Sequence, residues 1–219
     1  GQEFKTEMAE VQHLPPEEVV HRTTKLTSKE ICQIGRSLGI DWEKLAGLMD
    51  IPYSEQEEIR GSYNIYHSLS SKAKRVFELY NASKHFDRRV LVKYLEELGR
   101  HDLKKKMLPI KDEGGNEEVE QEKVHLQNNT PLSCREMCRL SQRLVVAWDT
   151  LAALLGISTA ERHDIHYSLL YNTSHSRAEK ILAIFNNMED FSRQKLAECL
   201  EEIGQVELKG PVITGEWRR

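Results

Sequence analysis

Three histidines lie close together in the second half of the chain, and their spacing could suit a metal ion. His163 and His166 are three residues apart, so on a helix they would share one side, while His175 follows nearby. No third ligand stands at a usual distance, so we interpret these as surface histidines. Cys134 and Cys138 could supply half of a site in the same way, but a cysteine such as Cys138 is commonly buried in a core. We therefore expect no metal and no cofactor.

Other patterns that would indicate catalysis are also missing from the sequence. It contains no glycine-rich phosphate loop, no Ser/His/Asp arrangement and no pair of acids in a catalytic motif. An active site between the halves of the chain would need polar residues that converge in a cleft, and the sequence offers no sign of them. We predict that the protein is not an enzyme.

The composition narrows the class of protein further. The chain has 219 residues, of which 39% are hydrophobic and 30% charged, with a formal net charge of -4. This apolar fraction is too high for general disorder, and there is no apolar run of about 18 residues to span a membrane. The net charge argues against a dedicated nucleic-acid binder, which is normally basic. With 12 glycines and only short β-branched runs, most of the chain should be helical.

The cysteines and the start of the chain indicate the compartment. Four cysteines occur in a lysine- and glutamate-rich sequence that shows no secretion signal. Such a chain is typical of a reducing environment, so we expect free thiols and a cytoplasmic protein.

The strongest signal is an internal repeat. Residues 26–62 align with residues 132–168 at an offset of 106, and after one dropped residue residues 66–104 align with 171–209 at an offset of 105. A register kept over this length indicates a duplicated unit. The recurring pairs include Glu30 and Glu136, Trp42 and Trp148, Asn81 and Asn186, and Arg88 and Arg193.

Each copy carries apolar residues at helical spacing in six short stretches, separated by capping residues and glycines. The stretch between the copies is acidic, contains glycine and lacks apolar periodicity, so it is predicted to be a flexible linker. In the second copy Gly210-Pro211 is predicted to end the last helix. The predicted segments are a weakly ordered N-terminal part (1–25), a first domain (26–109), a linker (110–130), a second domain (131–210) and a C-terminal tail (211–219).

The repeated elements resemble a death domain. In the first copy they are Trp-Glu-Lys-Leu-Ala at residues 42–46 and Leu-Glu-Glu-Leu-Gly-Arg-His-Asp-Leu at residues 95–103. The second copy has Trp-Asp-Thr-Leu-Ala at residues 148–152 and Leu-Glu-Glu-Ile-Gly at residues 200–204. The chain therefore resembles a tandem death-domain protein, and the Arg-His-Asp-Leu element leaves the related death-effector subfamily open for the first copy.

The sequence departs from the family pattern at two places. Tyr80 and Phe185 stand where many members carry a tryptophan, and the second copy has Gln-Val-Glu-Leu at residues 205–208 in place of Gly-Arg-x-Asp. The resemblance implies an all-α fold of two six-helix antiparallel bundles joined by the acidic linker. It also implies an adaptor that binds other death-fold domains, by homotypic or heterotypic contacts or by self-assembly, in apoptotic or innate-immune and NF-κB signalling.

Charged faces of the first copy are the candidate partner-binding site. Acidic and basic helix faces that mate head to tail would give such a contact, whereas the plainer interpretation is a solvated surface. Reversal of Arg88 and Arg89 to glutamate should then abolish partner binding and leave the melting transition unchanged. The candidate residues are Asp50, Glu55, Glu57, Glu58, Lys72, Lys74, Arg75, Arg88, Arg89 and Lys93.

Two alternatives remain at this point. The run Lys104 to Lys106 could make the first copy a helical nucleic-acid-binding module, with a steep loss of affinity in salt. The two copies could also pack on each other as one rigid unit, which the linker permits. The favoured adaptor needs neither nucleic acid nor a membrane. Its predicted structural core comprises Trp42, Leu45, Ile59, Leu95, Trp148, Leu151, Ile165 and Leu200.

Overall fold

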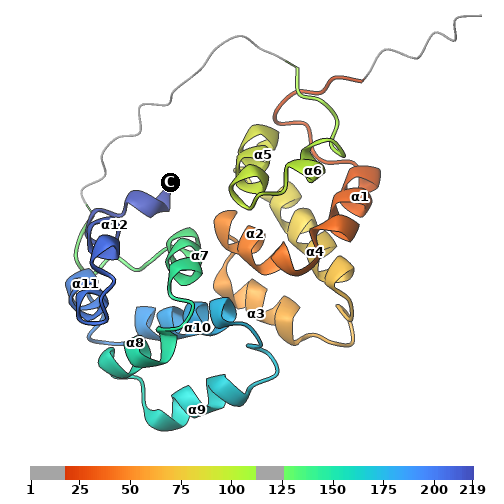
Figure 1. Cartoon of the computed structure of the whole chain (residues 1–219). Helices are drawn as coiled ribbons and strands as arrows, with labels where there is room; N and C mark the ends of the chain where they lie inside the picture. Colours follow the sequence, from red (N-terminus) through yellow and green to blue (C-terminus); the bar gives the residue numbers. More distant parts are fainter. Residues whose placement is uncertain (1–17, 112–125) are drawn as a thin grey trace, which may run out of the picture.

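The computed structural model describes residues 18–111 and 126–219, and its regular elements in these ranges are all helical (Figure 1). Most of the predicted linker lies outside the described residues. The prediction of an all-helical chain is confirmed for the described ranges. The first half contains α1 (Ser28–Leu38), η1 (Gly39–Asp41), α2 (Trp42–Leu48), α3 (Tyr53–Gly61), α4 (Leu69–Ala82), α5 (Arg88–Glu97) and α6 (His101–Lys104). The second half contains α7 (Cys134–Arg143), α8 (Trp148–Leu154), α9 (Thr159–Tyr167), α10 (Ser174–Asn186), α11 (Arg193–Glu202), η2 (Val206–Leu208), α12 (Lys209–Thr214) and η3 (Glu216–Arg218).

The helices of the first half surround one apolar core. Thr27 caps α1 in a reciprocal arrangement with Glu30, which satisfies free N–H groups at the start of the helix. The apolar face of α1 then packs along α4, and α2 closes the core against both α4 and α5. Ile34, Leu45 and Phe77 are among the side chains that this packing removes from solvent.

The helices of the second half surround a second core built by similar local contacts. Ser133 and Glu136 form the same reciprocal cap at the start of α7. Leu151 and Leu200, on α8 and α11, are fully buried in this core, where α8 packs against α10 and α11, and α10 packs against α7. An aromatic contact recurs as well: the ring centroids of Tyr80 and Phe86 are 5.2 Å apart in the first half, and those of Phe185 and Phe191 are 5.1 Å apart in the second.

The segment before α1 is attached to the first half. Val20 and Ile110 form an isolated parallel bridge, and the carbonyl of Arg22 accepts the N–H of Arg88 at 2.7 Å. The sequence suggested weak order for residues 1–25, but within residues 20–25 the backbone carbonyls serve as acceptors for a buried arginine on α5. Residues 1–17 lie outside the described range.

The last helix differs from the sequence prediction. Gly210-Pro211 does not end it, because α12 begins at Lys209 and continues to Thr214. Proline is tolerated in the first turn of a helix, where its missing N–H would have had no partner in the helix. Val212 is buried in the second core and Trp217 packs against it, so residues assigned to a C-terminal tail form part of the packed structure.

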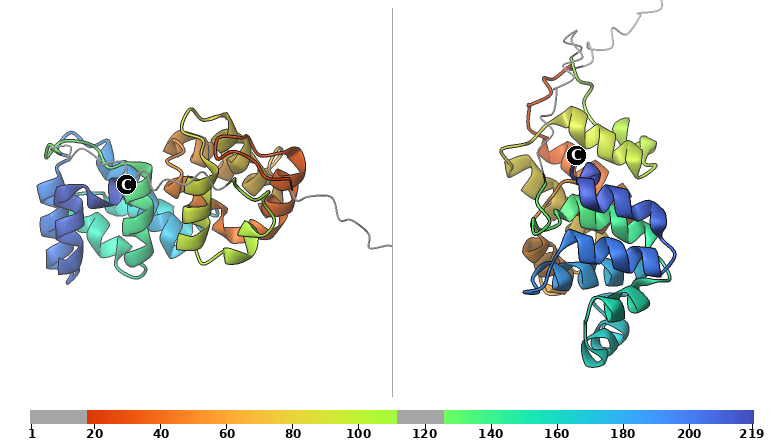
Figure 2. Two further views of the ribbon diagram at one scale, coloured as in Figure 1. Left: turned by 90° about the horizontal axis from the view of Figure 1, so that it is seen from above. Right: turned by 90° about the vertical axis from the view of Figure 1, so that its left-hand side faces the viewer.

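The two halves lie side by side and are in direct contact (Figure 2). α2 of the first half packs against α7 of the second. Cys138 of α7 is buried in the first core, and Tyr53 of α3 packs against the second. Gly47 allows this approach, since a Cβ atom there would lie 2.6 Å from the Cβ of Cys138. The alternative in which the two copies pack on each other therefore agrees with the observed contact.

Candidate protein-interaction surfaces

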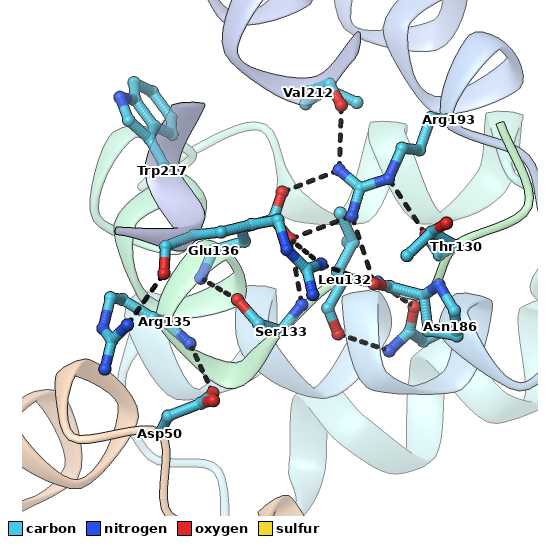
Figure 3. Close-up of polar contacts among 12 residues, drawn as sticks. Asp50, Thr130, Leu132, Ser133, Arg135, Glu136, Asn186, Arg193, Val212 and Trp217 are labelled. Carbon is cyan, nitrogen blue, oxygen red and sulfur yellow. Dashed lines mark hydrogen bonds and ion pairs between the residues drawn. The ribbon is translucent and has the colours of Figure 1, made fainter. Parts of the chain in front are cut away.

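The contact between the halves pairs acidic and basic groups. Arg139 of α7 donates two hydrogen bonds to the carboxylate of Glu97, at 2.8 and 2.9 Å. Arg135 donates from Nε to the carbonyl of Leu48 at 2.6 Å. Its backbone N–H donates to Asp50 at 3.4 Å (Figure 3). Paired, bidentate contacts of this kind fix orientation as well as adding energy. The acceptors come from the first half and the donors from the second.

Glu57 of α3 carries a further part of this contact. Its carboxylate accepts a hydrogen bond from the hydroxyl of Tyr171 at 2.6 Å and lies 3.6 Å from Nζ of Lys180. Within the first half it also pairs with Arg60 at 2.6 Å. Burial would raise the pKa of Glu57, but the Tyr171 hydroxyl and the charges of Arg60 and Lys180 outweigh it and lower the pKa below 4.5. Glu57 is therefore held as a carboxylate between the halves.

Two of the candidate partner-binding acids thus meet the second half of the same chain. Asp50 and Glu57 were expected to face another molecule, and each instead contacts a residue of α7 or α10, or of the segment before α10. The sequence could not reveal this, because the contact depends on how the two halves pack. Charge pairing between a first-half acidic face and basic groups occurs here within one chain.

Arg88 does not lie on a surface. It is fully buried, and its guanidinium donates to both carboxylate oxygens of Glu30 at 2.7 and 2.8 Å. It also donates to the backbone carbonyls of Thr24 and Lys25. The prediction that Arg88 contacts a partner is therefore wrong, and its reversal to glutamate would place two carboxylates together in the core rather than leave stability unchanged.

Lys72 lies at the edge of a groove between the halves. Its ammonium is 5.7 Å from the centroid of Trp42 and 5.6 Å from that of Tyr63, and burial lowers its pKa. The groove has a volume of about 320 Å³, and its lining includes Arg60 from the first half and His175 from the second. This position makes Lys72 part of the boundary between the halves rather than of an isolated basic face.

The remaining candidates of α3 and α4 are on the outer surface of the first half. Glu55, Glu58 and Arg75 share a small depression of about 50 Å³. Arg75 pairs with Glu78 at 3.5 Å, and Lys74 is half-buried against Gly35 of α1. These residues carry both signs of charge over a short distance, which is what a solvated helix face also presents.

A basic groove lies between α5 and α6. Arg89, His101, Lys104 and Lys105 line it around apolar side chains that include Met107, together with Glu96, which pairs with Lys104 at 3.4 Å; its volume is about 820 Å³. Lys93 is exposed on the same helix as Arg89. An apolar floor with a charged rim is the usual composition of a protein-binding surface. The sequence singled out Arg89 and Lys93 but could not show that α6 and the chain after it complete a groove.

All the residues expected in the core are buried, with Trp148, the most exposed of them, at 7%.

His163 and His166 are exposed, and His166 stacks on the Trp148 ring with centroids 6.3 Å apart. Cys134 does not join Cys138 in a ligand set; Cys138 instead meets His175 and Glu179. Sequence spacing could not find this cluster, because α7 and α10 are brought together only by the tertiary fold.

Within the described ranges, no helix combines the length and apolar character needed to cross a membrane.

Comparison with known proteins returns no matching curated protein and no matching solved structure. The family model for the Death domain matches residues 28–110, which span α1 to α6. Death domains are non-enzymatic modules for protein–protein interaction. Residues 28–110 are therefore similar to a Death domain, and the match does not extend to the second half.

Proposed function

We propose that the protein is a non-enzymatic adaptor made of two death domains, which binds other death-fold domains through a charged face of the first. Each domain would be a six-helix antiparallel bundle, with residues 26–109 forming the first and residues 110–130 the linker. The second would begin at residue 131 and extend beyond residue 210, because α12 belongs to its packed core.

Equivalent contacts in the two halves support the tandem arrangement. Arg88 and Arg193 each donate two hydrogen bonds to one glutamate, Glu30 or Glu136. Asn81 accepts from the backbone N–H of Leu26 at 2.8 Å and donates to its carbonyl at 3.2 Å. In the second half the corresponding distances between Asn186 and Leu132 are 2.7 and 3.0 Å (Figure 3). Such long-range contacts recur when two segments share one fold.

The choice of binding face rests on which charged side chains of the first half are already paired and which are free among the described residues. Asp50, Glu57 and Glu97 contact the second half, so these three acidic groups are used within the chain. By contrast, the side chains of Arg89 and Lys93 make no hydrogen bond or ion pair with any residue of the described ranges. The basic groove between α5 and α6 is therefore available to an acidic face of another death-fold domain.

The signalling role follows from the resemblance to the family. In this proposal the protein acts in the cytoplasm and links death-fold proteins in apoptotic or innate-immune and NF-κB pathways. A heterologous contact through the basic groove, repeated from molecule to molecule, would also allow open assemblies. Because the contact is charged, added salt should weaken it.

A pull-down with the full chain tests the proposal. The double variant Arg89→Glu/Lys93→Glu is compared with wild type and with Lys29→Glu/Arg36→Glu, which makes the same change of charge on exposed positions of α1. Mass spectrometry should identify death-fold proteins captured by wild type and by the α1 variant, and their loss with the α5 variant.

Two results would contradict the proposal. Capture of the same death-fold proteins by the α5 variant would exclude the basic groove as their site. Capture of nucleic acid by the wild-type chain, with a steep loss of affinity in salt, would favour the nucleic-acid alternative. Circular dichroism of each variant shows that the fold is retained, so a loss of binding is not a loss of structure.

A further inference from the structure

A cysteine, a histidine and a glutamate meet inside the second half, beneath its contact with the first. Cys138 comes from α7, and His175 and Glu179 are one turn apart on α10. One ligand atom of each lies within 4.8 Å of the other two. Cys138 also faces the first half, since its sulfur lies 3.3 Å from the carbonyl of Lys44 on α2.

The histidine and the glutamate of this cluster are buried without hydrogen bonds, whereas the thiol of Cys138 donates to the carbonyl of Lys44 and accepts from Nε2 of Gln142 at 3.5 Å. Glu179 is fully buried, and neither of its oxygens has a hydrogen-bond partner among the described residues. Both ring nitrogens of His175 are likewise buried and unpartnered, although its Nε2 approaches Glu179 closely enough for an ion pair when protonated. Buried polar groups in folded proteins are nearly always satisfied, because a lone buried carboxylate is costly. The carboxylate of Glu179 and the ring of His175 are therefore expected to bind a further group.

We propose that Cys138, His175 and Glu179 bind one zinc ion. Thiolate, imidazole and carboxylate are all zinc ligands, whereas the harder ions Mg²⁺ and Ca²⁺ favour oxygen ligands alone. On binding, the thiol of Cys138 releases its proton to solvent and its sulfur bonds to the metal. The thiolate and the Glu179 carboxylate then cancel the double charge of the ion, so the buried site is neutral overall.

The geometry needs only local adjustment. Ligand atoms around a tetrahedral zinc ion are about 3.5 Å apart, given metal–ligand distances near 2.0–2.3 Å. His175 and Glu179 must move slightly apart, and the widest pair, within 4.8 Å, must move closer by no more than about 1.3 Å. His175 also lines the groove of about 320 Å³ between the halves, which offers a route for the ion and room for a water as fourth ligand.

An ion at this position would stabilise the contact between two helices of the second half. It would join α7 to α10 directly under α2, where Gly47 and Lys44 meet Cys138. Zinc would thus hold in place the surface on which the first half rests. The site does not depend on the basic groove of the proposed function, so each can fail without the other.

Calorimetric titration of the metal-free full chain with zinc chloride tests the site. Wild type should bind one ion per chain, and Cys138→Ser, His175→Gln and Glu179→Gln should each weaken binding at least about 10-fold, since even partners of ligands typically contribute that much. Cys134→Ser, one turn away on α7, and His163→Gln, an exposed histidine, are matched controls that should bind as wild type does. Titration with Co²⁺ should add a thiolate-to-cobalt charge-transfer band that Cys138→Ser lacks.

Several results would overturn the proposal. These are no zinc binding by wild type at micromolar concentrations, unchanged binding in both Cys138→Ser and His175→Gln, or a cobalt spectrum without the thiolate band. Loss of binding in the Cys134 or His163 control would show that a different set of ligands holds the ion. His175→Gln keeps the test decisive if Cys138→Ser fails to fold, because His175 is at the edge of the groove and only partly buried.

Discussion

Arg193 lies inside the second core and holds Glu136 with two hydrogen bonds, 2.7 Å from Nη1 to Oε2 and 2.9 Å from Nη2 to Oε1 (Figure 3). Both side chains are at most 2% exposed. Nε of Arg193 reaches the carbonyl of Thr130 at 2.9 Å, just as Nε of Arg88 reaches Thr24 at 2.6 Å in the first half. Each arginine therefore ties α11 or α5 both to a capping glutamate and to the chain that enters the bundle.

Loss of either arginine should destabilise its half, and the loss of Arg88 should cost more. Arg88→Met leaves the buried carboxylate of Glu30 without its arginine, which typically costs about 3–5 kcal/mol in the free energy of unfolding. Arg193→Met should cost less, because Glu136 keeps an ion pair with Arg218 at 3.0 Å. Urea denaturation followed by circular dichroism measures this. Arg89→Met, the next residue on α5 and only partly buried, should change stability by no more than about 0.5 kcal/mol. Equal effects at Arg88 and Arg89 would show that the ion pair does not support the core.

Acid should lower the stability of the fold, because two glutamates have lowered pKa values in the folded state. Burial raises the pKa of Glu30, but hydrogen bonds from Arg88, Thr27 and Leu108 outweigh it and bring the pKa below 4.5; the pKa of Glu57 is lowered in the same sense. A carboxyl whose pKa is lower in the folded state contributes stability above its unfolded pKa and loses it as pH falls through the folded value.

The expected result is a melting temperature that is insensitive to these two groups from neutral pH down to about pH 5 and that falls below about pH 4.5. Glu57→Gln should show a shallower fall, because glutamine has no proton to gain and one titrating group between the halves is removed. Melting curves at a series of pH values compare the two proteins. An identical pH dependence would mean that the Tyr171 and Lys180 contacts do not favour the charged form of Glu57.

The approach of α2 to α7 should be sensitive to a single methyl group. Gly47→Ala places a Cβ atom 2.6 Å from the Cβ and 3.1 Å from the sulfur of Cys138, both closer than side chains normally approach. We expect the halves to separate while each keeps its helices, so small-angle scattering should show a larger radius of gyration with unchanged circular dichroism. Gly61→Ala, where a Cβ would meet nothing within 4 Å, is the control and should scatter as wild type does. A compact Gly47→Ala protein would show that the contact can adjust.

The helices and the core could be predicted from the sequence, because both depend on local periodicity and on a repeat that marks the same apolar positions twice. Trp42 and Trp148 are buried as their paired positions suggested. The end of the last helix was predicted wrongly, since Gly210-Pro211 suits a first turn as well as a helix end. The Gly-Pro pair alone cannot distinguish a helix end from a first helical turn. The burial of Val212 in the second core distinguishes them.

The charged residues were harder to place, for a physical reason. An arginine in an amphipathic helix is usually on the surface, and Arg88 is buried only because Glu30 and two carbonyls from a distant segment satisfy it. The repeat of both Arg88 and Glu30 at Arg193 and Glu136 was the available signal, since a surface charge pair has little reason to recur together. The partners of Asp50 and Glu57 depend on how the halves meet, which no local pattern encodes.

The hydrogen bond from Tyr171 to Glu57 should couple the two halves energetically. At 2.6 Å to a charged acceptor, it belongs to a class that contributes about 1.5–3 kcal/mol. In a double-mutant cycle of Tyr171→Phe and Glu57→Gln, the combined loss of stability should therefore be smaller than the sum of the single losses by at least about 0.5 kcal/mol. The same cycle with Glu57→Gln and Tyr167→Phe, an exposed tyrosine on α9, should be additive. Additivity of both cycles would mean that the Tyr171 contact exerts no net attraction, and the pairing of the halves would then depend on Arg135, Arg139 and the packing of Cys138 against Gly47.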